Sequence, residues 1–233
     1  MKKGELKRGN ILSAAEKLFF EQGYDQTSIQ DILDALSISK GGFYHHFTSK
    51  EAILEEICEK RIASRFERLG MELYAPRMSP MDKINLLLRM VNLFDRDEPR
   101  FVALMLKICY LDHDVQILSR MRQLVMTRLQ PYLDEAIAEG LQAGLLYTRH
   151  PGWISRMILG MVSDLDDEAC RKLSSDFENP ECIIDIADML NACRDAIETL
   201  IGAPFGSVCL FDPEKLILDF HAAAAELVKL EGK

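Results

Sequence analysis

Apolar residues recur at three- and four-residue intervals along almost the whole chain, a spacing that predicts helices and requires no strand. In the segment 27–50, one apolar face predicts a first helix from about Ser28 to Leu36, and its members are Ile29, Ile32, Leu33 and Leu36. The pattern breaks at Ser37 and Ile38 and resumes in a second, shorter helix. Two short helices separated by a tight turn predict a helix-turn-helix over residues 28–47.

Polar residues mark the expected start of each helix in this segment. Thr27 with Gln30 fits a capping box for the first helix, and Ser39 offers an oxygen to the free N–H groups of the second. Thr48 with Glu51 repeats the capping box for a third helix. The segment therefore predicts three helix starts in quick succession.

The second short helix has residue types that suit the DNA backbone. Gly41 and Gly42 each cost roughly 1 kcal/mol inside a helix relative to alanine, so the pair favours close approach of another molecule. Phe43 and Phe47 are expected to pack inward. The alternative is a simple glycine loop beside a solvated basic face. We expect DNA contacts from Thr27, Ser28, Ser39, Lys40, Gly41, Gly42, Tyr44, His45, His46 and Lys50.

The stretch from about Leu6 to Arg61 resembles the DNA-binding domain of the TetR family of transcriptional regulators. The similarity lies in the order and spacing of ILSAAEKLFFEQGY, TSIQDI, SKGGFYHHF and SKEAIL, and it covers about a quarter of the chain. Leu33 and Asp34, together with Leu36, Ser37 and Ile38, depart mildly from the family's pattern, which does not put DNA binding in doubt. The resemblance implies an all-helical homodimer whose variable C-terminal part binds a small effector and controls DNA affinity.

Charge is unevenly divided between the two parts of the chain. Residues 1–50 carry seven Lys and Arg against six Asp and Glu, net +1, and the remainder carries 21 against 31, net −10. Only the N-terminal part suits a polyanion. Lys2, Lys3, Lys7 and Arg8 could form a basic arm along DNA or a solvated tail. No apolar run is long enough to span a bilayer, so a soluble, cytoplasmic protein without a membrane partner is expected.

The sequence carries no recognisable catalytic, metal or cofactor signature. The sequence contains no G-x-S-x-G, P-loop, G-x-G-x-x-G or H-E-x-x-H motif, so we expect neither an enzyme nor a cofactor. The six cysteines are widely spaced and form no C-x-x-C, which favours buried reduced thiols, with redox sensing as the alternative. The acidic clusters 112–114 and 164–168 lack metal-site spacing, so no metal is expected.

The remainder of the chain predicts a helical scaffold. A long connecting helix is expected over 49–74, and it is the only covalent route from the C-terminal part to the recognition segment. Further helices are expected over 81–95, 100–111, 116–143, 150–173, 181–201 and 213–230, with a kink or junction at Pro131. The fold class is therefore all-α, with a DNA-binding domain over 5–65 and an effector-binding and dimerisation domain over 66–233.

Two surfaces in the second domain are candidates for partners. The broad apolar faces of 150–173 and 181–201 suit a four-helix dimer interface, or alternatively the core of one chain. Methionine-rich segments suit an apolar or amphipathic effector, because methionine lines irregular cavities, although it also fills ordinary cores. The candidate ligand contacts are Met90, Phe94, Met105, Tyr110, Met126, Trp153 and Met157.

These observations favour a dimeric, sequence-specific regulator, a repressor released from a palindromic double-stranded operator by a small molecule. A ligand lodged against the connecting helix would swing it and spoil the spacing of the two recognition helices. The alternative from another class is a helical small-molecule-binding module that does not regulate DNA.

Overall fold

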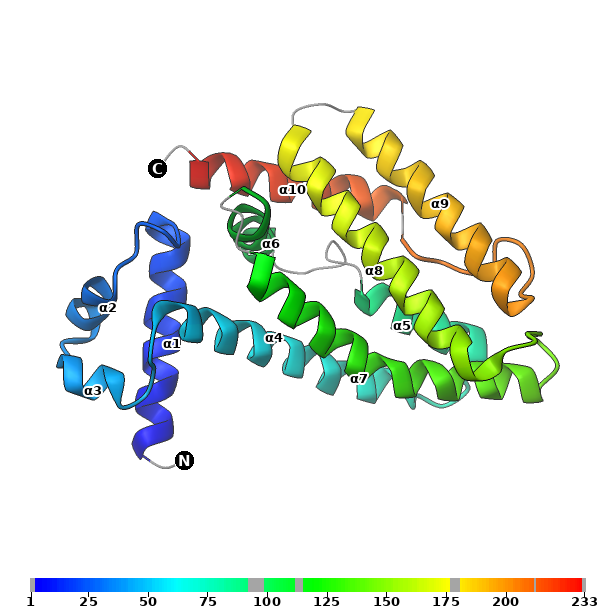
Figure 1. Cartoon of the computed structure of the whole chain (residues 1–233), viewed down its shortest axis with the longest axis horizontal. Coiled ribbons are helices and arrows are strands. Elements are labelled where there is room, and N and C mark those ends of the chain that lie inside the picture. Colours follow the sequence, from blue (N-terminus) through cyan, green and yellow to red (C-terminus); the bar gives the residue numbers. More distant parts are fainter. Residues whose placement is uncertain (1–2, 92–98, 112–114, 177–180, 212, 232–233) are drawn as a thin grey trace.

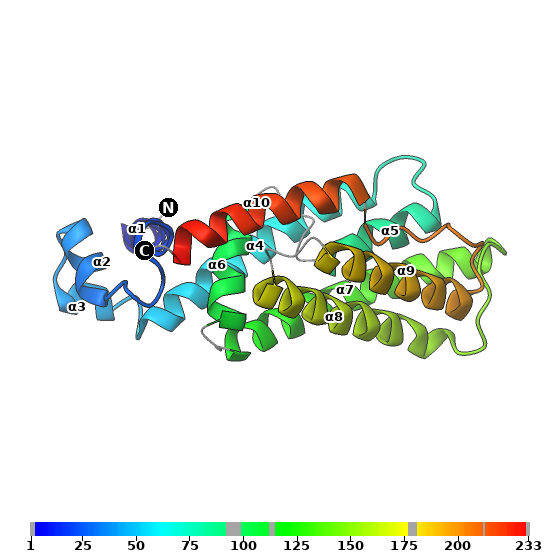
Figure 2. The same cartoon turned by 90° about the horizontal axis from the view of Figure 1, so that it is seen from above.

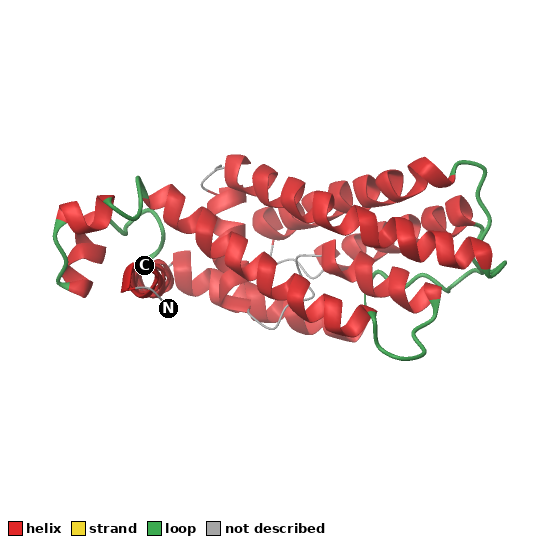
Figure 3. Cartoon of the chain, turned by 90° about the horizontal axis from the view of Figure 1, so that it is seen from below, coloured by secondary structure: helices red, strands yellow, loops and turns green. Residues whose placement is uncertain are grey.

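The computed structural model describes residues 3–91, 99–111, 115–176, 181–211 and 213–231, and within these ranges it contains helices and no strand (Figure 3). The prediction of an all-α fold is confirmed. The elements are α1 (Lys3–Gln22), α2 (Ile29–Leu36), α3 (Lys40–Tyr44), α4 (Lys50–Leu73), α5 (Pro80–Val91), α6 (Pro99–Leu106), a π-helical turn η1 (Lys107–Leu111), α7 (Val115–Gln142), α8 (Pro151–Asp176), α9 (Glu181–Ile201) and α10 (Pro213–Glu231).

The molecule is elongated, with a small head and a long helical body (Figure 1). The head consists of α1, α2, α3 and the first turns of α4. The rest of α4 extends into the body, where it contacts α5 and α7. Helix α10 packs along α6, and its C-terminal end lies close to α1 (Figure 2). The head is therefore joined to the body by α4 and is also contacted by α6.

The buried apolar side chains form two clusters. The head cluster contains the core of α1–α4 and also residues of α6, η1, α7 and α10; its members include Phe19, Phe43, Phe47, Leu54, Phe101, Met105, Leu118 and Leu227. The body cluster joins the second half of α4 to the later helices; its members include Leu73, Leu87, Val102, Leu106, Leu129, Ile158 and Ile197. Helix α6 thus contributes to both clusters from different faces.

Helix α7 runs through Pro131 as one element, so the junction expected there is absent. A proline inside a helix leaves the carbonyl four residues earlier without its backbone donor. That carbonyl belongs to Thr127, an exposed residue, where water can replace the lost bond. The solvent-facing position explains why the helix continues.

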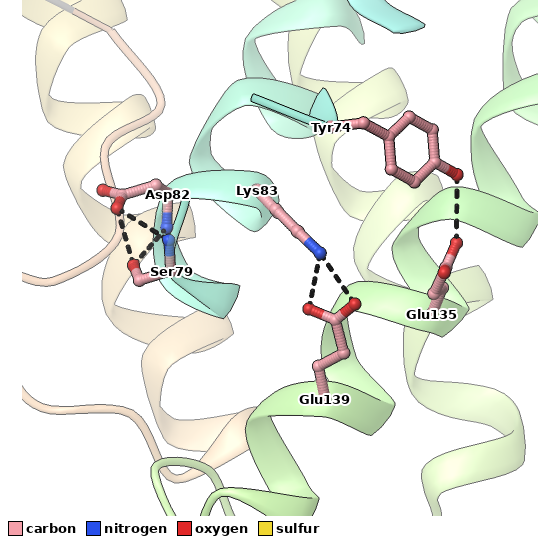
Figure 4. A network of polar contacts seen from close by, with 6 residues as sticks. All are labelled: Tyr74, Ser79, Asp82, Lys83, Glu135 and Glu139. Carbon is pink, nitrogen blue, oxygen red and sulfur yellow. Dashed lines mark hydrogen bonds and ion pairs between the residues drawn. The ribbon is translucent and has the colours of Figure 1, made fainter. Parts of the chain in front are cut away.

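The far end of α4 is fixed to α7 by polar contacts (Figure 4). The Tyr74 hydroxyl donates to Glu135 at 3.4 Å, and Lys83 Nζ lies 2.7 Å from both carboxylate oxygens of Glu139. At the same end of the body, Gly202 follows α9 with φ +62°, and a Cβ there would lie 2.7 Å from the Tyr147 carbonyl. Both contacts hold the end of the body that is remote from the head.

Candidate nucleic-acid interface and effector cavity

The first helix of the predicted helix-turn-helix begins one residue later than expected. Ser28 is the N-cap of α2, and it forms a complete capping box with Asp31. Thr27 is only 1% exposed, and its hydroxyl donates to the Gly23 carbonyl at 2.7 Å. The prediction of Thr27 as the cap is wrong, and its buried side chain is not available to DNA.

The turn between α2 and α3 depends on a left-handed residue that is not glycine. Ser37 has φ 53° and ψ 44°, and its N–H donates to carbonyls of the last turn of α2. The N–H of Ile38 then bonds to the Leu33 carbonyl at 3.1 Å. Ser37 is one of the residues at which the sequence departs from the pattern that it otherwise resembles, and the turn still closes, at the conformational cost of a left-handed serine.

Helix α3 presents one buried and one exposed face. Ser39 is its N-cap, as predicted, and accepts a bond from the Gly42 N–H at 3.2 Å. Phe43 is fully buried and Phe47 is 2% exposed, which confirms that both pack inward. The exposed face carries Lys40, Gly41, Gly42, Tyr44 and His45, with His46 half-buried beside them. A positive charge, a phenol and an imidazole therefore share one solvent-facing surface.

The protein itself gives no reason for the glycine pair in α3. Neither Gly41 nor Gly42 has a positive φ. A Cβ at Gly41 would meet no atom within 4 Å, and one at Gly42 would be in ordinary contact with Ser39. Glycine is unfavourable in a helix, and neither internal packing nor a turn requires it here. The missing side chains therefore favour the close approach of another molecule to this part of α3.

Lys50 serves the fold of the head. Its Nζ donates to the Tyr24 carbonyl at 2.7 Å and lies 4.2 Å from the centre of the Tyr24 ring. The role predicted for it as a phosphate donor is therefore not supported by its position. The predicted cap of the third helix also shifts by one residue, because Ser49 and not Thr48 accepts from the Ala52 N–H.

Arg8, expected in a basic arm, also has internal partners. Its guanidinium binds both carboxylate oxygens of Glu56, donates to the His46 carbonyl and lies 4.3 Å from the centre of the Phe47 ring. These contacts tie α1 to α4 and to the end of α3. Arg8 therefore supports the end of α3 from its buried side. The expected basic arm is part of α1, which is helical from Lys3 onwards.

A narrow cavity lies between the two clusters. Its apolar wall includes four residues packed in or against the head cluster, Phe101, Met105, Leu118 and Met121, and four packed against the body cluster, Met90, Val91, Val125 and Met126. The free volume is about 60 Å³. Four flexible methionine side chains can rearrange more easily than branched ones, so this wall can adapt to a guest.

Polar side chains line the same cavity. Arg65, Arg122, Ser163 and Asp166 contribute to it from α4, α7 and α8. Arg65 donates to the Met90 carbonyl at 3.2 Å, and Arg122 lies 2.6 Å from a carboxylate oxygen of Asp167. None of the four is among the predicted ligand contacts, because no local sequence pattern shows that polar residues more than 40 positions apart on α4, α7 and α8 meet in one cavity.

The predicted ligand contacts divide into three groups. Met90, Met105 and Met126 come together at the cavity. Trp153 and Met157 do not reach it; they are 63% and 49% exposed on the outside of α8. Phe94 lies outside the described residues, as does the side chain of Tyr110. The helical pattern could not separate the inward from the outward face of α8, because both carry large apolar residues.

The late helices bury most of their apolar residues within one chain. Ile154, Ile158, Ile186 and Ile197 belong to the body cluster, which supports the alternative of an intrachain core for these positions. Trp153, Met157 and Ile184 remain exposed on α8 and α9. An apolar surface of limited extent is thus left on this helix pair.

Five of the six cysteines are buried free thiols, as expected, but Cys209 is exposed, so the expectation of burial is wrong for that residue. In the described part of the chain, no group of three or more His, Cys, Asp or Glu side chains is arranged to hold a metal, and residues 112–114 lie outside that part. Cys58 is fully buried, and burial raises the pKa of its thiol to about 12, which makes it a poor nucleophile. Among the described helices, none is long and apolar enough to cross a membrane.

Comparison with known proteins connects the head to a family. The family model described as bacterial regulatory proteins, tetR family, matches residues 11–57. The regulator YerO of Bacillus subtilis strain 168 is 40% identical over 63 residues, which is 27% of this chain and 22% of YerO. The repressor KstR2 of Rhodococcus jostii strain RHA1 is 45% identical over 51 residues, 22% of this chain and 25% of KstR2. These matches span only about a quarter of each relative's length.

Solved structures extend the likeness of fold to most of the chain. A TetR-family regulator from Pectobacterium atrosepticum has a TM-score of 0.62 at 19% identity and covers 87% of this chain and 97% of its own. A transcriptional regulator from Saccharomonospora viridis, solved in complex with choline, has a TM-score of 0.57 at 18% identity and covers 84% and 98%. The head is thus similar in sequence, and the body only in fold.

Proposed function

We propose, from the premise that this chain belongs to the TetR family of bacterial regulatory proteins, that it is a dimeric transcriptional repressor released from a palindromic operator by a small molecule. Proteins of this family are DNA-binding regulators and not enzymes. The observation that carries the proposal is the exposed face of α3, where Lys40, Gly41, Tyr44 and His45 lie together with no internal partner that explains the glycine.

The exposed face of α3 fits the major groove of DNA. A recognition helix must pack against the protein on one face and be exposed to solvent on the other. Here Phe43, Phe47 and Arg8 hold the inner face of α3, while its outer residues are exposed. Lys40, Tyr44 and His45 offer donors to phosphate oxygens or base edges, whereas the Ser28 hydroxyl already donates to Asp31 in the capping box of α2. Thr27 and Lys50 are not included in this set, because their polar groups serve the fold of the head.

A two-fold dimer follows from the way such helices read DNA. Two recognition helices related by a two-fold axis read inverted half-sites about one helical turn apart, roughly 34–36 Å. The exposed Trp153, Met157 and Ile184 on α8 and α9 support a dimer contact on this helix pair. A carboxylate in place of Met157 would be buried without a partner in that contact and should yield monomers.

The position of the cavity supports regulation by a ligand. Its wall is shared between residues that pack with the head and residues that pack with the body, so a guest too large to be accommodated by the methionine side chains alone would move one cluster relative to the other. The structure from Saccharomonospora viridis with bound choline supports the view that a body of this fold accepts a small organic molecule. A coupling of about 1–3 kcal/mol would change operator affinity roughly 5- to 150-fold.

The test is a mobility-shift and footprinting experiment with the DNA that flanks the protein's own gene. We expect a protected region with two inverted half-sites, and we expect Tyr44→Ala and Lys40→Ala to weaken binding. Arg128→Ala is the matched control, because Arg128 is exposed on α7, away from the head. Full binding by the two α3 variants, or protection of one asymmetric half-site, would contradict the proposal.

A further inference from the structure

The segment that leads from α9 into α10 is fixed to the body by hydrogen bonds from two helices. The Asn85 side chain of α5 donates to the Ser207 carbonyl at 2.9 Å and accepts from the Cys209 N–H at 2.9 Å. The Glu198 carboxylate of α9, which is 3% exposed, accepts from the Val208 N–H at 2.9 Å. These three bonds hold the chain just before α10 to both α5 and α9.

Helix α10 runs from this anchored segment along α6 towards the head (Figure 2). Its 19 residues give a length of roughly 28 Å, and residues 222–225 are four consecutive alanines, which is the strongest helix former. Ala223 is 4% exposed and belongs to the body cluster, whereas Leu227, one turn later, is 1% exposed and belongs to the head cluster. One continuous helix therefore joins an anchored part of the body to the head cluster.

The last turns of α10 lie against the part of α6 that meets α1. Glu226 pairs with Arg100 of α6 at 3.5 Å and with Lys229 at 2.6 Å. Arg100 in turn lies 5.0 Å from the centre of the Phe20 ring of α1. Ion pairs with exposed partners contribute little by themselves, so the buried Leu227 is expected to hold α6 more strongly than Glu226 does.

We infer that α10 fixes the position of the head through α6, with Leu227 and Glu226 as positioning residues for DNA binding. The head is joined covalently to the body only by α4, and a part joined through one helix can rotate or bend about it. Support of α6 by α10 restricts that motion. In a dimer, the two recognition helices then keep the one separation that inverted half-sites require. The consequence for DNA binding rests on the proposed function, whereas the fixed position of the head does not.

The first experiment measures the position of the head in the full chain without DNA. Spin labels are attached through ketone-bearing residues at Ser13 of α1 and Ala138 of α7, both of which are exposed, so the cysteines stay unchanged. Labelled chains are mixed with excess unlabelled chains, and pulsed electron paramagnetic resonance then reports the distance between the two labels of one chain. We expect a narrow distribution in the unaltered protein and one about twice as wide in Leu227→Ala.

Val228→Ala is the matched control, because Val228 follows Leu227 on α10 and is 52% exposed. Its distance distribution should stay as narrow as that of the unaltered protein, and Leu227→Met, which nearly keeps the apolar volume, should stay close to it. Circular dichroism shows whether each variant folds; if Leu227→Ala does not, the smaller change Leu227→Val decides in its place. An unchanged distribution in the folded variant would overturn the inference, whether or not the protein binds DNA.

The second experiment separates positioning from stability by comparing a DNA fragment that has both half-sites with one that has a single half-site. On the complete site, Leu227→Ala should lose affinity about ten-fold and Glu226→Gln about two-fold, and on the single half-site neither should change. An extra base pair between the half-sites should weaken binding of the unaltered protein more than that of Leu227→Ala, because a less restricted head can adapt.

Equal losses on both fragments would indicate a general loss of stability and would overturn the positioning role. Unchanged affinity of Leu227→Ala for the complete site would overturn it as well. If the unaltered protein binds neither fragment, the proposed function fails, and the distance measurement still decides whether α10 fixes the position of the head.

Discussion

The head cluster and the body cluster are built from the same kinds of buried aliphatic and aromatic side chains, but they differ in where their residues come from. Most of the head cluster lies within residues 11–58, and its elements follow one another closely. The body cluster collects residues from Leu69 to Ala223. Helix α6 belongs to both, since Val102 and Leu106 face the body while Phe101 and Met105 pack with the head.

This difference shows that the head has two mechanical connections to the body. The covalent one is α4, whose C-cap residue Tyr74 donates to Glu135 of α7, while Lys83 of the following helix α5 pairs with Glu139 of α7 (Figure 4). The second is the non-covalent contact of α6 with α1, where Arg100 lies between the Phe20 ring and Glu226 of α10. Because Phe101 and Met105 of α6 line the cavity, the proposed regulation by a ligand has a route to the head through α6 as well as through α4.

The largest expected effect tests whether the head cluster stands on its own core. Phe43→Ala removes a fully buried ring and should lower the free energy of unfolding by about 3–5 kcal/mol, with loss of DNA binding. Chemical denaturation followed by circular dichroism measures the first effect and a mobility shift the second. Phe205→Ala is the control on the body: the ring is 82% exposed, so the change should stay within about 0.5 kcal/mol. Similar losses in both variants would contradict the assigned core.

The next prediction distinguishes a lysine on the exposed surface of the head from a lysine that stabilises its fold. Lys40→Ala should cost about 1–3 kcal/mol of binding free energy, because Lys40 lies on the exposed face of α3. Lys50→Ala should leave the dependence of DNA affinity on salt unchanged and should instead lower thermal stability, since Lys50 holds the Tyr24 carbonyl. Affinity measured at several salt concentrations decides the point. A salt slope reduced by about 0.9 in Lys50→Ala would return this residue to the phosphate contacts.

A smaller effect is expected from the contacts of Arg61, which join α4 to α1 and to α6. Arg61 on α4 binds Glu16 of α1 at 3.1 Å and lies 4.2 Å from the centre of the Phe101 ring on α6. Arg61→Met keeps the apolar stem and should cost about 1 kcal/mol of stability. It should also reduce the change in DNA affinity that the ligand causes, because the contact of Arg61 with the Phe101 ring of α6 is lost. Arg149→Met, at an exposed position between α7 and α8, serves as control. An unchanged ligand response in Arg61→Met would show that coupling does not use this contact.

The head could be predicted from the sequence more fully than the cavity, for a physical reason. The helix-turn-helix is encoded by local signals, so its helices and the inward Phe43 and Phe47 were found. The caps were misplaced by one residue at Thr27 and Thr48, because serine and threonine neighbours can both cap and only the backbone angles decide between them. The roles of Lys50 and Arg8 depend on partners more than 20 residues away in the sequence.

The cavity was only partly predictable because it needs tertiary structure. Methionine content indicated three of its lining residues, Met90, Met105 and Met126. Trp153 and Met157 share the same apolar character but face outward, and no periodicity distinguishes a core face from a partner face. Arg65, Arg122 and Asp166 resemble ordinary surface charges in the sequence. Only the packing of α4, α7 and α8 brings them together.

The smallest expected effect compares two equivalent caps, one in the head and one in the body. In α2 the Ser28 hydroxyl and N–H both donate to Asp31 at 2.7 Å, and in α5 the Ser79 hydroxyl and N–H donate to Asp82 at 2.7 and 3.2 Å. These bonds lower the pKa of both carboxyl groups below the ordinary value of 3.8. A carboxyl group whose pKa is lower in the folded state stabilises the fold above its unfolded pKa of about 3.9, and this contribution is lost as the pH falls through the folded pKa.

Ser28→Ala and Ser79→Ala should therefore each raise the pKa of their own aspartate towards the ordinary value, which NMR titration of the two carboxyl groups would measure. Each substitution should also lower the melting temperature slightly at pH 7, and by less near pH 3. Because α2 belongs to the head, only Ser28→Ala should also weaken DNA binding; an equal loss of DNA affinity from Ser79→Ala would mean that the start of α5 is coupled to the recognition surface as strongly as α2 itself.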